Sequence, residues 1–172
     1  MEISKTILSS DQINKRILEL GNEISSDYKG KKLVLIGILN GAFIFLADLA
    51  RAIDLELEID FIRVASYGNN MSTSGTITLA KEPEIDLEGK SILLVEDIVD
   101  TGSTLAWLNE YLTKFNPESV KICSLIDKHE RREVEVTVDY VGFSLDKGFL
   151  IGYGLDYAQK FRNLPAVHSM DA

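Results

Sequence analysis

Two acidic residues and a turn rich in hydroxyl groups follow an aliphatic run in the middle of the chain. Glu96 and Asp97 come directly after Ile92–Val95, and Asp100 precedes Thr101–Thr104, which contains a glycine. Backbone N–H groups and hydroxyls at the start of a helix bind phosphate. Carboxylates accept hydrogen bonds from sugar hydroxyls or contact a hydrated Mg²⁺ ion. The pattern predicts a site for a phosphorylated sugar, with Asp100 facing whatever the phosphate is attached to.

Three simpler interpretations of the same turn do not account for its residues. Ser103 or Thr104 would cap a helix, with the acids near its positive end, but this does not explain Glu96 and Asp97 directly after aliphatic residues. An aspartic protease would need a second Asp-Thr-Gly and an all-β fold, and the sequence has neither. A P-loop is excluded because no Gly-x-x-x-x-Gly-Lys-Ser/Thr run occurs.

Two other apolar runs end in residues that can bind a ligand. Leu39-Asn40-Gly41 follows one run, and its glycine allows a close approach of the backbone to a ligand. Asp127-Lys128 follows another, and a lysine there can donate to a carbonyl oxygen of a bound ring. On local grounds a plain turn and a solvated lysine remain open.

These residues need a scaffold that brings the ends of several strands together. Continuous apolar runs of strand length are separated by residues at helical spacing, which is typical of a parallel sheet covered on both faces. The runs are Leu33–Leu39, Ile92–Val95 and Val120–Ile126, with further strands at Val138–Phe143 and Phe149–Ile151. Ligands bind at the carboxyl ends of such strands. The predicted chemistry therefore gathers at one edge of the sheet.

The remaining segments frame this sheet. Ser9 and Gln12 fit a capping box that opens an amphipathic helix. Leu57, Ile59 and Phe61 alternate with acidic residues and predict a strand with its apolar side chains inward. The polar run 66–75 has almost nothing to bury, so we expect a mobile loop there, carried by a small antiparallel flap.

Composition narrows the class of protein. The 172 residues include 18 Lys and Arg against 27 Asp and Glu, a net charge of −9. We expect one domain, with no membrane span, because Leu33–Ala50 is interrupted by glycines and polar residues. The acidic balance argues against a nucleic-acid partner. A single cysteine, Cys123, and the absence of a secretory signal in Met1–Ser9 predict a cytoplasmic protein.

Val95–Leu105 closely resembles the phosphoribosyl pyrophosphate (PRPP) binding motif of type I phosphoribosyltransferases. Leu39–Gly41, Asp127-Lys128 and Phe149–Asp156, together with Ser66-Tyr67 and Arg162, stand in the order and spacing of the hypoxanthine (hypoxanthine-guanine) phosphoribosyltransferase family. The resemblance extends from the first helix to Pro165. It implies an α/β fold in which a parallel sheet flanked by helices carries a small hood, at about 145–172, and a flexible antiparallel flap, at about 57–80.

The resemblance implies transfer of ribose 5-phosphate from PRPP to hypoxanthine or guanine, with Mg²⁺ as cofactor. Asp100 would be the general base toward the purine N7 proton, and Lys128 would donate to the 6-oxo group. The other implied roles fall into four groups: Thr101, Gly102, Ser103 and Thr104 for the 5-phosphate; Glu96 and Asp97 for the ribose and Mg²⁺, with Asp156 for a second Mg²⁺; Leu39, Asn40, Gly41, Ser66, Tyr67 and Arg162 for pyrophosphate; Phe149 and Leu150 for the base.

One position departs from the family pattern, and one other class of protein remains. Many relatives carry a basic residue where this chain has Asn40, so only the backbone contact with pyrophosphate, often made through a non-proline cis peptide, carries over.

The alternative is a regulatory RNA-binding protein of the pyrimidine-attenuator type, which keeps the PRPP fold. Such a protein needs a basic surface, and the acidic balance offers little material for one. The family also implies a homodimer or homotetramer.

Overall fold

The computed structural model describes residues 3–65 and 77–170. Within these ranges the helices are α1 (Ser10–Asp27), α2 (Phe43–Ala52) and α3 (Ser103–Thr113). The strands are β1 (Ile3–Leu8), β2 (Leu33–Leu39), β3 (Leu57–Ala65), β4 (Thr78–Lys81), β5 (Ser91–Val99), β6 (Ser119–Lys128), β7 (Tyr140–Leu145), β8 (Phe149–Ile151) and β9 (Val167–Met170). No helix in the described part of the chain is long and apolar enough to cross a membrane.

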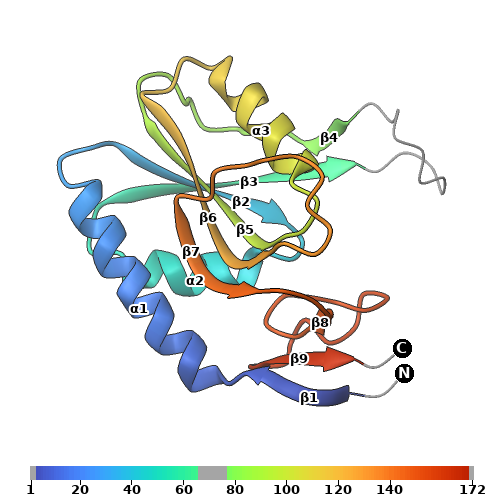
Figure 1. The fold of residues 1–172 in the computed structure, drawn as a ribbon. Helices are drawn as coiled ribbons and strands as arrows, with labels where there is room; N and C mark the ends of the chain where they lie inside the picture. The colour runs from blue at the N-terminus through green and yellow to red at the C-terminus, as the bar shows by residue number, and fades with distance from the viewer. Residues whose placement is uncertain (1–2, 66–76, 171–172) are drawn as a thin grey trace.

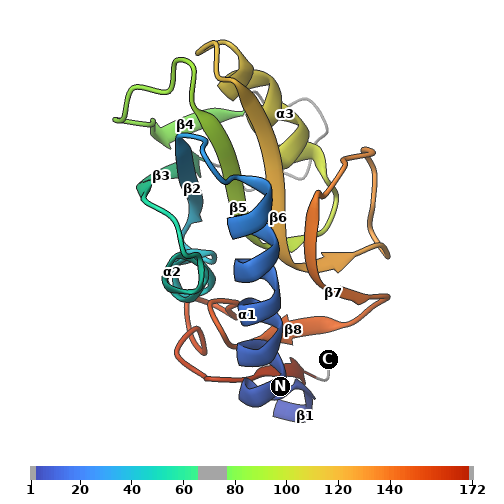
Figure 2. The same ribbon diagram turned by 90° about the vertical axis from the view of Figure 1, so that its left-hand side faces the viewer.

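The large sheet has the strand order β4-β3-β2-β5-β6-β7 (Figure 1). Its five neighbouring strands β3, β2, β5, β6 and β7 pair in parallel, and β4 pairs with β3 antiparallel as the predicted flap. Figure 2 shows α1 and α2 on one face of this sheet and α3 on the other. The predicted α/β class, a parallel sheet flanked by helices, is confirmed.

Alternation along the central strands divides the core between the two faces. Leu35, Leu93 and Leu125 pack with α1 and α2, whereas Ile36 and Leu94 pack with α3. Strands that are buried on both sides need apolar residues at every position, because successive side chains point to opposite faces. This requirement explains the continuous aliphatic runs in the sequence.

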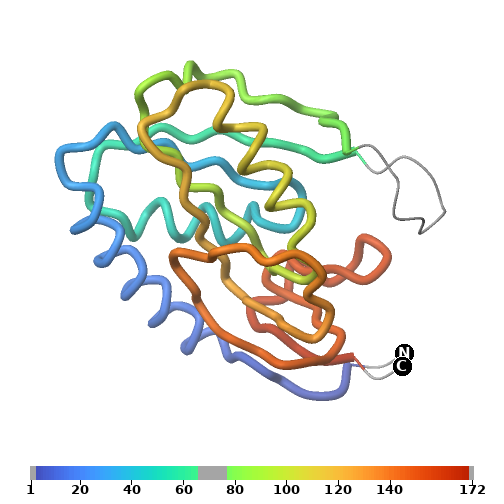
Figure 3. The backbone as a smooth tube through the Cα atoms, turned by 45° about the horizontal axis from the view of Figure 1, so that its top comes forward, coloured from blue at the N-terminus to red at the C-terminus, as the bar shows by residue number. Residues whose placement is uncertain are grey.

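A second, smaller sheet with the order β1-β9-β8 forms the hood. Its central strand β9 lies near the C-terminal end of the chain and pairs antiparallel with β1 from the N-terminal end, with Thr6 opposite His168. Figure 3 shows the blue segment that precedes α1 beside the red segment at the C-terminal side of the described chain. The sequence predicts a hood from the C-terminal segment alone and indicates neither β1 nor β9.

Two local expectations about strands were wrong. β5 does not end at Val95 but continues to Val99, so Glu96 and Asp97 lie inside the strand. In β3 Leu57 and Phe61 pack against the core as predicted, but the alternation fails between them, because Ile59 is 43% exposed whereas Asp60 is buried. The Asp60 carboxylate accepts hydrogen bonds from the backbone N–H groups of Phe61, Glu84 and Ile85 and pairs with Lys81. A buried carboxylate that is fully hydrogen-bonded is tolerated in place of an apolar residue.

Candidate active site

The hydroxyl-rich turn lies where β5 passes into α3. Gly102 is the N-cap residue of α3, and its φ of +86° is in the left-handed region that favours glycine. Within the described residues no side chain caps this helix, so the proposal that Ser103 or Thr104 is a plain cap is wrong. The N–H of Ser103 makes a long hydrogen bond of 3.4 Å to Thr101 Oγ1, and the N–H groups that follow it at the start of α3 are available to an anion. A cavity of about 150 Å³ opens there, lined by Glu96, Ile98, Val99, Asp100, Thr101, Gly102, Thr104 and Leu105.

A second cavity, of about 240 Å³, adjoins the first through Asp100 and Ile98, which line both. It brings together predicted residues from distant parts of the chain. These are Asp97, Asp100, Lys128, Phe149, Leu150 and Asp156, and Arg131, Gly148 and Leu155 complete the lining. A small ring placed in the second cavity would share Asp100 with a phosphate group bound in the first.

Lys128 and Phe149 lie where the second cavity is predicted to hold a purine base. Lys128 ends β6 and is buried, with its Nζ 3.7 Å from Asp100 Oδ1 and 3.8 Å from Glu130 Oε2. Phe149 begins β8, and its exposed ring packs edge-on against Tyr157, with 5.8 Å between the ring centroids. The cavity therefore offers a cationic donor at one point of its wall and an aromatic face at another.

The two strand acids serve different cavities: Glu96 lines the first and Asp97 lines the second. Burial, together with the neighbouring charge of Asp97, raises the pKa of Glu96 well above its ordinary value. A cation at this position would favour the ionised pair.

The Leu39–Gly41 loop follows β2 and meets the second cavity at Asp97. The peptide bond between Leu39 and Asn40 is cis. A side chain on Gly41 would collide with the carboxylate of Asp97, so a larger residue at this position would displace that acid. Asn40 is exposed and brings no charge to the loop.

The hood contributes Asp156 and Arg162. Arg162 contacts Asp156 Oδ1 at 3.0 Å and donates to the carbonyl oxygen of Gly154 at 2.7 Å. Ser103 and Arg162 line neither of the two cavities, in contrast to the other described residues of the turn and to Asp156. The predicted residues Ser66 and Tyr67 lie outside the described residues.

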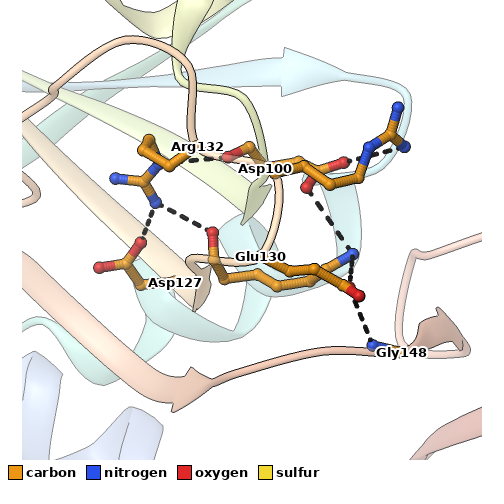
Figure 4. Close-up of polar contacts among 7 residues, drawn as sticks. Asp100, Asp127, Glu130, Arg132 and Gly148 are labelled. Carbon is orange, nitrogen blue, oxygen red and sulfur yellow. Dashed lines mark hydrogen bonds and ion pairs between the residues drawn. The ribbon is translucent and has the colours of Figure 1, made fainter.

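The sequence prediction missed a group of residues that connect the turn to the base cavity. Arg132 donates from Nε to the carbonyl oxygen of Asp100 (3.1 Å) and from Nη2 to that of Lys128 (3.2 Å), and it pairs with Asp127 (Figure 4). Glu130 accepts a hydrogen bond from the N–H of Gly148 at 3.3 Å. The run of charged residues 127–133 is the sequence feature that could have indicated Arg132 and Glu130, but such runs usually lie on a solvated surface.

The fold and this site together define a phosphoribosyltransferase domain. Residues 4–158 match the phosphoribosyl transferase domain family, and the chain belongs to it. The hypoxanthine-guanine phosphoribosyltransferase of Aquifex aeolicus is 45% identical to this chain over 168 residues, which cover 97% of this chain and 94% of that protein. The hypoxanthine phosphoribosyltransferase of Escherichia coli is 44% identical over 165 residues, 95% of this chain and 93% of that one.

Solved structures agree with these sequence relatives. A hypoxanthine-guanine phosphoribosyltransferase from Bacillus anthracis matches with a TM-score of 0.93 at 42% identity, covering 99% of this chain and all of that one (100%). A hypoxanthine phosphoribosyltransferase from Staphylococcus aureus matches with a TM-score of 0.94 at 37% identity, covering 98% and 92%. Within the larger family, the chain thus belongs to the hypoxanthine(-guanine) phosphoribosyltransferases, transferases that act on PRPP and a purine base and generally use a divalent metal ion.

Proposed function

We propose that this enzyme of purine salvage transfers the 5-phosphoribosyl group of PRPP to hypoxanthine and guanine, releasing IMP or GMP and pyrophosphate. The observation that supports this most directly is the placement of Asp100, which lines both the phosphate-sized cavity at the start of α3 and the cavity that holds Lys128 and Phe149. The sugar then lies between a phosphate bound at the turn and a base bound against β8.

Asp100 and Lys128 act on the base. The Asp100 Oδ1 atom is buried and, among the described residues, accepts no hydrogen bond, so it is available for the N7 proton of the purine. The Lys128 ammonium donates to the 6-oxo group, and it disfavours adenine because the 6-amino group of adenine is itself a donor. Phe149 stacks on the base, and the backbone of Leu150 contacts its edge.

The phosphates are bound at the opposite side of the sugar. Thr101, Gly102, Ser103 and Thr104 hold the 5-phosphate with hydroxyls and backbone N–H groups. Pyrophosphate is held by the backbone of Leu39, Asn40 and Gly41 and by Arg162, and we assign Ser66 and Tyr67 to the same role. Since Asn40 is uncharged, Arg162 supplies the positive charge at this end.

Mg²⁺ is the metal that we propose. Among the described residues, no three Asp, Glu, His or Cys side chains come close enough to form a metal site by themselves. Mg²⁺ is commonly bound by one or two carboxylates together with substrate phosphates and water, so Glu96, Asp97 and Asp156 fit it as separate contributors. When bound, the ion neutralises the charge on the departing pyrophosphate.

The test is a turnover assay of the purified protein with Mg²⁺ and PRPP. Hypoxanthine and guanine should each yield the nucleotide, and adenine should not. Asp100→Asn should lower kcat far more than it weakens PRPP binding, and an equal loss of both would make Asp100 a binding group. Absence of turnover with hypoxanthine, guanine and xanthine would refute the proposed enzymatic function. Salt-dependent RNA binding without turnover would favour the regulatory RNA-binding protein.

We further propose one domain over residues 1–172, a cytoplasmic location and a homodimer or homotetramer. The free, buried thiol of Cys123 supports a reducing compartment. The pairing of β1 with β9 supports a single folding unit, since it joins the two ends of the chain. Light scattering coupled to gel filtration measures the number of subunits, and a monomer at assay concentration would exclude the oligomer.

A further inference from the structure

A tight turn at the end of β8 carries a strained aromatic residue. Gly152 and Leu155 exchange two backbone hydrogen bonds, of 2.9 and 3.0 Å, which close a turn around Tyr153 and Gly154. Both central residues have positive φ, 51° at Tyr153 and 99° at Gly154. Glycine, asparagine and aspartate are the residues that adopt this conformation readily. A tyrosine there needs a compensating contact to keep it in place.

That contact is made with α2. The hydroxyl of the buried Tyr153 donates to the carboxylate of Asp48, on the helix that follows the Leu39–Gly41 loop. Burial, and then the hydrogen bond to Asp48, raise the pKa of Tyr153, so the phenol keeps its proton over the working range of pH. Asp48 also pairs with Arg51, whose side chain is largely exposed.

The turn also touches the predicted pyrophosphate loop directly. A side chain on Gly154 would collide with the carbonyl oxygen of Gly41, so the two backbones are in close contact. Arg162 donates to the carbonyl oxygen of this same Gly154 and pairs with Asp156. The position of the turn relative to Gly41 therefore sets the position of Asp156 and Arg162 relative to the loop.

The base-binding residues do not depend on this contact. Phe149 and Leu150 precede the turn and are held in the small sheet, where they pair with Met170 and Ser169 of β9. Loosening the turn would displace the residues that follow it and leave β8 in place.

We propose that Tyr153 and Asp48 are positioning residues, which dock residues 152–162 on α2 and so align Asp156 and Arg162 with the pyrophosphate loop. The inference rests on the proposed function for its kinetic consequence. It goes beyond that function because neither side chain lines the two cavities or touches a substrate group.

The test compares Tyr153→Phe and Asp48→Ala with the wild-type enzyme. Each should raise the KM for PRPP by about tenfold, the fold-change expected when a charge-assisted hydrogen bond no longer favours the docked state. The KM for hypoxanthine should change by less than about twofold, because β8 stays paired. Amide hydrogen exchange of residues 152–162 should become faster in both variants, whereas that of β8 should not.

Arg51→Ala is the matched control, because it removes the other partner of Asp48 and leaves the tyrosine contact intact. It should change neither the KM for PRPP nor the exchange of residues 152–162. Asp48→Asn keeps an acceptor for the tyrosine hydroxyl, so the KM for PRPP and the exchange of residues 152–162 should stay close to those of the wild type. The double variant Tyr153→Phe with Asp48→Ala should resemble either single variant, since both remove one contact.

The outcomes separate the two proposals. A wild-type protein without turnover would refute the proposed function, and the exchange measurement would still test the docking contact. With an active wild type, equal changes in the KM of both substrates, unchanged exchange of residues 152–162, an additive double variant, or the same effect from Arg51→Ala would each overturn the positioning role.

Discussion

Replacing Arg132 by lysine tests whether the site depends on an arginine that contacts protein groups only. The guanidinium bonds the carbonyl oxygens of Asp100 and Lys128 and pairs with the buried carboxylate of Asp127. Only 10% of the Arg132 side chain is exposed. Lysine keeps the charge and can still reach one of these partners, but its ammonium cannot bridge groups that the planar fork of arginine joins. We therefore expect the Arg132→Lys variant to fold, but with the turn at Asp100 displaced relative to the cavity that contains Lys128.

The size of the effect follows from the contacts that are lost. A hydrogen bond to a charged group contributes roughly 1.5–3 kcal/mol, so losing the two carbonyl contacts, with some replacement by water, should lower the free energy of unfolding by about 2–4 kcal/mol. A domain with a stability of ~5–15 kcal/mol remains folded after that loss. Because the carbonyls belong to Asp100 and Lys128, displacement by an ångström should also reduce kcat by roughly 10²-fold.

Arg16→Lys is the control for this experiment. Arg16 also bonds two backbone carbonyl oxygens, those of Gly142 (3.0 Å) and Val141 (2.7 Å), but it does so between α1 and β7, outside both cavities. Urea unfolding should show a comparable loss of stability in both variants, with an unchanged m-value. Initial rates at saturating substrate should fall only in Arg132→Lys. Equal kcat values in the two variants, whether unchanged or lowered, would refute the inference that Arg132 aligns the active site.

Three further changes have defined outcomes. Lys128→Gln should raise the KM for hypoxanthine and narrow the preference over adenine, which competition between the two bases measures. Phe149→Ala should weaken base binding by roughly 1–3 kcal/mol, the usual contribution of base stacking, with little change in the KM for PRPP. Asp60→Asn should cost about 1–3 kcal/mol in urea unfolding at pH 7, because the amide cannot accept every N–H that the carboxylate accepts. Burial opposes ionisation of Asp60, but the hydrogen bonds from Ile85, Phe61 and Glu84 lower its pKa below 3.8, so the wild-type advantage is present above about pH 4 and disappears as pH falls through the lowered pKa.

Much of the large sheet could be predicted because its physical causes are local. A strand buried on both faces has to be apolar at each position, and β2, β5 and β6 stand out for that reason. The capping box was equally readable: Ser9 Oγ accepts from the N–H of Gln12 at 3.2 Å, and the Gln12 side chain accepts from the N–H of Ser9 at 2.8 Å. Such signals lie within a few residues of each other in the chain.

The small sheet could not be predicted because its cause is remote. β1 is exposed over most of its length, and its partner β9 is more than 160 residues away, as in the contact between Thr6 and His168. Asp60 illustrates the same limit within β3, since the N–H groups of Glu84 and Ile85 that satisfy it come from beyond β4. In both cases the deciding hydrogen bonds join segments that no local pattern relates.

The candidate site divides in the same way. Residues that the motifs identify, such as Asp100, Lys128 and Phe149, carry groups that a substrate would touch, and their types reflect that chemistry. Arg132 and Tyr153 instead bond protein groups. Arg132 binds the carbonyl oxygens of Asp100 and Lys128, and Tyr153 binds the carboxylate of Asp48 on α2. The carbonyl contacts of Arg132 leave no requirement on the partners' side chains, and Tyr153 lies 105 residues from Asp48, so neither pairing has a local sequence signature. Alignment of the cavities thus depends on contacts that only the folded chain reveals. The kinetic comparison of Arg132→Lys with Arg16→Lys measures how much this alignment contributes to kcat, which the sequence motifs do not indicate.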